Sequence, residues 1–101
     1  MHEKRKQPRV PVSLDVLWES AMGKGEARTS DISLAGCFID TIVQVAVGET
    51  ISFKLRLPSG EWIQLQGEVK YELPRLGFGV RFKGLSDLTQ KKLEAHFKTP
   101  E

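Results

Sequence analysis

Two arginines near the start of the chain are the residues best suited to bind an anion. Arg5 and Arg9 stand four positions apart, and Lys4 and Lys6 flank the first of them. In an extended chain both guanidinium groups lie on one side, roughly 13 Å apart, and a bend at Pro8 brings them closer. Arginine forms paired hydrogen bonds with phosphate and with the O6 and N7 edge of guanine. The pattern indicates a site for a phosphorylated ligand, although it also suits a solvated tail that improves solubility.

A second polar stretch, SDISLAG at residues 30–36, supplies complementary groups. Asp31 and Ser33 share one side of an extended segment, where the carboxylate can accept from a base N–H and the hydroxyl can donate or accept. Gly36 allows a tight reversal or a close approach of the backbone to a ligand. The same residues also suit an Asx or Ser turn between two strands, and the sequence leaves both interpretations open.

Catalytic chemistry has little support. His2 and His96 have no cysteine or acid at metal-ligand spacing, and Ser33 has neither a nearby histidine base nor a nucleophile motif around it. Asp40 and Glu49 fall at turns or polar faces, where solvated surface charge is the simpler interpretation. The sequence therefore predicts a binding protein and not an enzyme, without catalytic residues, metal or cofactor.

The elements that must position these groups are short strands. Apolar residues recur at every second position in four stretches, which predicts strands with one buried face. These stretches are residues 12–18, 51–57, 62–72 and 76–82. Weaker strands at 26–33 and 36–41 bring the total to about six, with turns at close spacing, which favours a small antiparallel barrel or sandwich.

The apolar faces of these strands predict the core. Phe53, Tyr71, Phe78 and Phe82 all fall on such faces and are predicted to be buried. Gly67 lies on the apolar face of its own strand, where it predicts a bulge or a sharp bend.

The last part of the chain has a helical period. Ser86 is a candidate N-cap, and Leu85, Leu88, Leu93 and Phe97 approximate one face, which predicts a helix over about 86–97. We expect residues 10–101 to form one mainly all-β domain with this helix at its end. Residues 1–9 are polar and without a hydrophobic period, which predicts a flexible basic arm.

Composition limits the partners and the compartment. The 101 residues contain 15 Lys and Arg against 13 Asp and Glu, a net charge of +2. This near-neutral balance and the lack of an aromatic ladder among basic residues argue against binding to DNA or RNA. There is no secretory signal, no apolar run approaching the ~20 residues that cross a bilayer, and only one cysteine, Cys37. We therefore expect a cytoplasmic protein without membrane insertion.

Taken together, Arg5-x-x-x-Arg9 before the first strand and Asp31-x-Ser33-x-x-Gly36 between the second and third resemble the motif pair of the PilZ domain family. The run DISLAGCFI is typical of that family, and GFGVRF resembles its late strand. The resemblance extends from Lys4 to the C-terminal helix. It implies a bacterial protein with a six-stranded antiparallel β-barrel of PilZ type and a C-terminal helix.

The resemblance also implies that the chain is a receptor for the second messenger cyclic di-GMP. Arg5 and Arg9 would contact phosphates and guanine faces, and Asp31, Ser33 and Gly36 would line the pocket around one guanine. Three further residues are predicted to contact the ligand: Lys4 and Lys6, which add charge beside Arg5, and Gly79.

We expect the ligand to order the arm and so to expose or create a surface for an unidentified downstream protein. Extra charge at Lys4 and Lys6 suits an intercalated ligand dimer, and a single ligand per domain is the alternative, so a monomer and a ligand-linked dimer both stay open. A PilZ-fold interaction module that acts without nucleotide is the second hypothesis. An RNA- or single-strand-binding barrel is the third, and the charge balance disfavours it.

Overall fold

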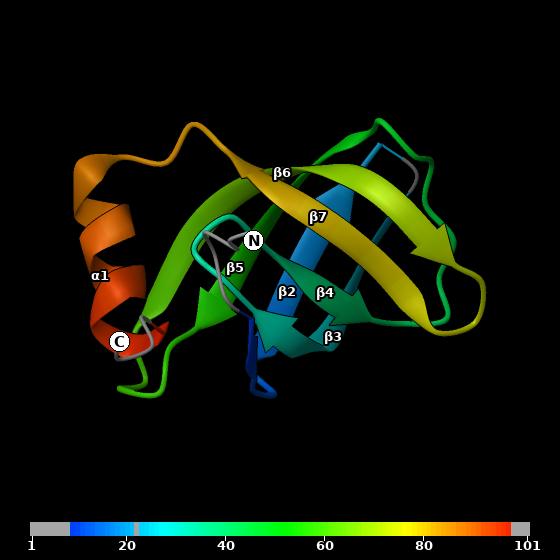
Figure 1. Ribbon diagram of the computed structural model, residues 1–101. Helices are drawn as coiled ribbons and strands as arrows, with labels where there is room; N and C mark the ends of the chain where they lie inside the picture. Colours follow the sequence, from blue (N-terminus) through cyan, green and yellow to red (C-terminus); the bar gives the residue numbers. More distant parts are fainter. Residues whose placement is uncertain (1–8, 22, 98–101) are drawn as a thin grey trace, which may run out of the picture.

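The described residues of the computed structural model, 9–21 and 23–97, form seven strands and one helix (Figure 1). The elements are β1 (Val10–Pro11), β2 (Asp15–Ser20), β3 (Gly23–Ile32), β4 (Gly36–Asp40), β5 (Thr50–Arg56), β6 (Trp62–Leu73), β7 (Gly77–Lys83) and α1 (Asp87–Phe97). All paired strands are antiparallel, in the order β1-β3-β2-β5-β6-β7-β4, and pairing of β3 with β4 closes the sheet. The result is a six-stranded barrel with one extra short strand, β1, and a C-terminal helix. This confirms the predicted fold class.

The barrel interior is filled by the alternate apolar residues of the strands. Phe53, Phe78 and Phe82 are all buried, as predicted. The ring of Trp18 meets Phe78 edge-on, with centroids 5.8 Å apart, and Phe53 packs on Phe82 at 6.1 Å. Because the period of two places every second side chain inward, the polar residues between them face solvent.

Two predictions for β6, a bulge at Gly67 and burial of Tyr71, are wrong. Gly67 is not at a bulge, since it stays in register opposite Phe82. Its lack of a side chain relieves crowding instead, because a Cβ there would lie 3.1 Å from a carbonyl oxygen of β7. The register shift falls between Val69 and Tyr71, where Lys70 is the extra residue. One extra residue reverses the alternation, so Tyr71 is 42% exposed and not part of the core.

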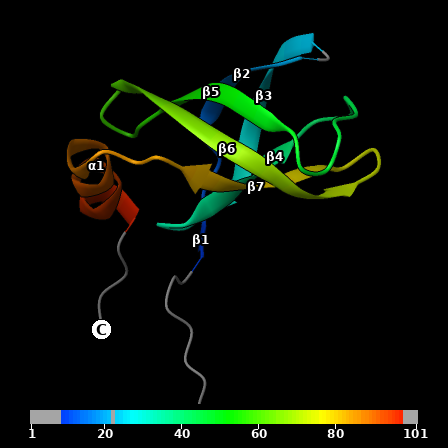
Figure 2. The ribbon, with the colours of Figure 1, turned by 90° about the horizontal axis from the view of Figure 1, so that it is seen from above.

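The helix α1 lies beside one end of the barrel, as Figures 1 and 2 both show. Ser86 precedes it and its Oγ accepts a hydrogen bond from the Thr89 amide at 3.1 Å, which is the expected N-cap. Leu93 and Phe97 form its buried face. No helix within residues 9–21 and 23–97 has the length and apolar character needed to span a membrane.

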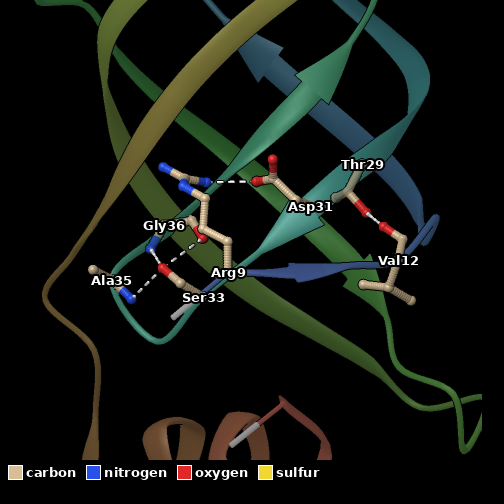
Figure 3. Close-up of polar contacts among 7 residues, drawn as sticks. All are labelled: Arg9, Val12, Thr29, Asp31, Ser33, Ala35 and Gly36. Carbon is tan, nitrogen blue, oxygen red and sulfur yellow. Dashed lines mark hydrogen bonds and ion pairs between the residues drawn. The ribbon is translucent and has the colours of Figure 1, made fainter. Parts of the chain in front are cut away.

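The strands β1 and β2 both pair with β3 and are separated by residues 12–14. Thr29 of β3 bridges this interruption: its buried hydroxyl donates to the Val12 carbonyl at 2.6 Å and accepts from the Leu14 amide at 3.0 Å. Figure 3 shows the contact with Val12. The side chain thereby satisfies backbone groups that the strand ladder leaves unpaired. It also sets the path of the chain that leads from Arg9 into the barrel.

Candidate anion-binding site

A pocket of about 270 Å³ lies where the beginning of β1, the β3–β4 turn and strands β6 and β7 meet. Its lining includes Arg9, Ser33, Gly36 and Gly79, which the sequence predicts as site residues. These four residues come from three separate segments of the chain. The fold therefore brings most of the two motifs and the late strand to one place.

Arg9 stands at the pocket and is held by Asp31. Its Nη1 donates a hydrogen bond to Asp31 Oδ1 at 2.5 Å, as Figure 3 shows. The contact follows from backbone register, because Pro11 of β1 pairs with Asp31 of β3. Both side chains are partly exposed, so the pair adds little to stability. Its effect is to fix the direction of the guanidinium group, while Asp31 itself stands behind Arg9 and does not line the pocket.

Ser33 holds the turn between β3 and β4. Its Oγ accepts hydrogen bonds from the Ala35 amide at 3.1 Å and the Gly36 amide at 3.2 Å (Figure 3). The Ser33 amide also donates to the Gly36 carbonyl at 2.8 Å. The side chain is buried. The turn that the sequence left open as an interpretation is therefore present, and the hydroxyl shapes the pocket wall through the backbone.

Gly36 and Gly79 both lie at close approaches within the protein, Gly36 to the backbone of β7 and Gly79 to the side chain of Tyr71. A Cβ on Gly36 would lie 2.1 Å from the Val80 carbonyl oxygen, so the close approach expected at this glycine is to β7. A Cβ on Gly79 would lie 2.4 Å from the ring of Tyr71. The absence of both side chains lets β4 pair with β7 and lets the tyrosine ring lie across β7.

The sequence interpretation misses five lining residues of the pocket, and three of them have polar side chains: Lys70, Tyr71 and Arg81. Arg81 is exposed and forms no ion pair with any residue the structure describes, and the Lys70 ammonium lies 3.9 Å from a Glu68 carboxylate oxygen. Together with Arg9 they give the pocket three cationic groups, which favours an anionic ligand. Only strand register could have found Arg81, because it reaches the site by pairing with Gly36.

Cys37 lies beneath the site and is fully buried. Burial raises the pKa of its thiol well above the usual range; the Asp31 carboxylate raises it further, and the Arg9 guanidinium opposes this. Because the thiolate is the nucleophilic form, this cysteine is not a candidate for covalent chemistry.

A larger hollow of about 480 Å³ lies over strands β2, β3 and β5. Its lining contains charges of both signs, namely Glu19, Lys24, Glu26 and Lys54. Such a mixture does not create a positive potential, so we place the candidate anion site at the smaller pocket. The other predicted cations, Lys4, Arg5 and Lys6, lie outside the described residues.

The fold and the site define a small antiparallel barrel with a cationic pocket at the entry of its first strand. Residues 3–98 match the family model of the PilZ domain, and the chain belongs to this family. PilZ domains are generally receptors for cyclic di-GMP, and typically binding or effector modules.

Two solved structures resemble the chain. The Bacillus subtilis inhibitor of motility (MotI/DgrA) superposes with a TM-score of 0.76 at 18% identity, over 91% of this chain and 48% of that one. The present chain thus spans about half of its length. The PilZ domain of CeSA from a cellulose-synthesizing bacterium superposes with a TM-score of 0.68 at 15% identity, over 88% and 94% of the two chains. At these identities the similarity establishes the fold alone, and no curated protein matches the sequence significantly.

Proposed function

We propose that this protein binds cyclic di-GMP at the pocket beside Arg9 and passes the signal to a partner protein. The observation that carries the proposal is the convergence of Arg9, Ser33, Gly36 and Gly79 on one pocket. Lys70 and Arg81 strengthen it, because a ligand with two phosphates needs several cations.

The geometry supports a different role in ligand binding for each charged side chain of the site. Arg9 offers a planar, partly exposed fork to a phosphate or to the O6 and N7 edge of guanine. Asp31 lies next to the pocket and not in its lining, so its first role is to orient Arg9. Its carboxylate can accept a further hydrogen bond from a guanine N–H that reaches the edge of the pocket. Arg81 and Lys70 come from β7 and β6, line the same pocket and suit the phosphates.

The size of the pocket supports a contribution from the N-terminal residues. At about 270 Å³ it falls just below the roughly 300–1,000 Å³ typical of small-molecule sites. It therefore suits one part of a ligand that has two guanines and two phosphates. In the proposal, Arg5 and its neighbouring lysines cover the remainder, and their ordering creates the surface that a partner recognises.

Calorimetric titration with cyclic di-GMP tests the binding. We expect saturable binding by the full chain and a loss of roughly ten- to hundredfold in affinity for Arg9→Ala, because hydrogen bonds to charged groups are worth about 1.5–3 kcal/mol. Arg56→Ala is the matched control: Arg56 is an exposed arginine of β5 beside Asp15 and does not line the pocket. Its affinity should equal that of the wild type.

Absence of saturable binding would contradict the proposal and favour the interaction module that acts without nucleotide.

The signalling step has a separate test by limited trypsin digestion. Cleavage after Lys4, Arg5 and Lys6 should slow when cyclic di-GMP is added, and unchanged cleavage would argue against ordering of this segment.

A further inference from the structure

The bulge in β6 places an aromatic ring where the strand pattern would not put one. Val69 pairs with Val80 and Tyr71 with Gly79, so Lys70 has no partner in β7. Val69 is fully buried, whereas Tyr71, two positions later, is 42% exposed. A regular strand would have turned both side chains into the core. Bulges of this kind commonly re-aim a side chain next to a binding site.

The ring of Tyr71 is held in place by the protein around it. Gly79 leaves the space that the ring occupies, since a Cβ there would lie 2.4 to 2.8 Å from three of the tyrosine atoms. Phe38 packs against the ring with centroids 6.0 Å apart and an interplanar angle of 30°. Packing against Phe38 restricts the ring on one side, which reduces the conformational freedom that it loses when a ligand covers it.

The exposed part of the ring belongs to the cationic pocket. Tyr71 lines it together with Arg9, Lys70 and Arg81. An aromatic surface surrounded by cations suits a ligand that carries both a flat base and a phosphate, since bases stack on aromatic side chains while the phosphates meet the cations.

We propose that Tyr71, turned outward by the bulge at Lys70, is the base-stacking residue of the pocket. The inference rests on the proposed function and extends it, because it assigns the affinity for the base to a residue outside both sequence motifs. The phenol oxygen has no part in it, so the aromatic ring alone is the required feature.

Titration of cyclic di-GMP into three variants tests the role of the ring. Base stacking contributes about 1–3 kcal/mol, so Tyr71→Ala should weaken binding roughly 5- to 150-fold. Tyr71→Phe keeps the ring and should stay within about threefold of the wild type. Tyr71→Leu keeps apolar area without a ring and should resemble the alanine variant. Leu73→Ala is the matched control, since Leu73 is an outward residue of the same strand that is 44% exposed and does not line the pocket.

Proton NMR provides a readout that a merely structural role would not change. The guanine H8 signal should move upfield on binding to the wild type and to Tyr71→Phe, and this shift should be lost with Tyr71→Ala. Equal affinities for wild type, Tyr71→Ala and Tyr71→Leu would overturn the inference while leaving the proposed function intact.

Failure of the wild type to bind cyclic di-GMP would instead refute the proposed function. The ring would then be probed with cyclic di-AMP and 5′-GMP at millimolar concentration. Binding of either probe that is lost in Tyr71→Ala would support a purine platform, and absence of any binding would overturn both proposals.

Discussion

At the scale of single residues, Gly36 has two structural roles at the β3–β4 turn. It accepts the hydrogen bond that closes the turn begun by Ser33, and it lies against the Val80 carbonyl of β7. An added Cβ at this position would lie 2.1 Å from the Val80 carbonyl oxygen. Because that oxygen belongs to the backbone and cannot rotate away, the methyl group would have to push β4 and β7 apart.

Gly36→Ala is therefore expected to destabilise the protein by about 1–3 kcal/mol or more, the range of overpacking substitutions. Urea unfolding followed by tryptophan fluorescence measures the change. Gly25→Ala is the control, because a Cβ at Gly25 would make only ordinary contacts of 3.4 to 3.5 Å with Trp18. Equal stability of the two variants would show that β4 and β7 can separate without cost.

Cys37 predicts a dependence of stability on alkaline pH. Burial raises the pKa of the folded thiol above its value of about 8.5 in an unfolded chain. Below that pH both states keep the proton. Above it only the unfolded state releases the proton, so the free energy of unfolding should fall by roughly 1.4 kcal/mol per pH unit. Urea unfolding at pH 7, 9 and 10 under reducing conditions should show this loss in the wild type but not in Cys37→Ala. Parallel pH profiles would contradict it.

At the scale of elements, the junction of β1 and β2 depends on the hydroxyl of Thr29. Thr29→Val keeps the shape but leaves the Val12 carbonyl and the Leu14 amide without their partner. We expect a loss of about 1–3 kcal/mol, the cost of buried unsatisfied polar groups. Thr29→Ser keeps the hydroxyl and should lose only about 0.8 kcal/mol for the missing methyl group. Thermal and urea unfolding compare the two, and a valine variant more stable than the serine variant would disprove the role of the hydroxyl.

The strands show what periodicity can and cannot predict. Alternation in residues 51–57 locates β5 and its buried face correctly, because nothing interrupts that strand. In the sequence of β6 the same alternation runs from Ile63 to Tyr71, but in the structure Lys70 is an extra residue. A bulge needs no particular residue type, so the sequence contains no signal for it. The sequence predicts the bulge at Gly67, because glycine is common at bulges. In the structure this glycine is needed for a different reason, namely that a side chain there would crowd the backbone of β7.

At the scale of the whole molecule, ligand binding should appear as increased thermal stability. A ligand at 100 times its dissociation constant stabilises the folded state by about 2.7 kcal/mol. For a domain of this size each kcal/mol corresponds to roughly 4–8 °C, so the unfolding midpoint should rise by about 10–20 °C with cyclic di-GMP. For Arg9→Ala at the same ligand concentration, a ten- to hundredfold weaker affinity leaves about 0.4–1.4 kcal/mol of stabilisation, so its midpoint should rise by only about 2–11 °C. A wild-type midpoint that does not move at saturating ligand would contradict the proposed binding.

The candidate site was only partly predictable for a reason that belongs to the whole barrel. Arg9, Ser33 and Gly36 stand out because they form local motifs with recognisable spacing. Lys70 and Arg81 belong to no motif and reach the pocket only through the pairing of β6 with β7 and of β7 with β4. Register between distant strands is a tertiary property, and a short sequence pattern does not contain it.

The turn from Ser33 to Gly36 has a consequence for comparing relatives of this protein. Both residues satisfy requirements of the barrel itself, through the amides of the turn and the carbonyl oxygen of Val80. A relative that does not bind a nucleotide would still need both residues in order to fold. The presence of Ser33 and Gly36 in a related sequence is therefore weak evidence that the relative binds a ligand. The ion pair of Arg9 and Asp31 adds little to stability, so its presence is stronger evidence.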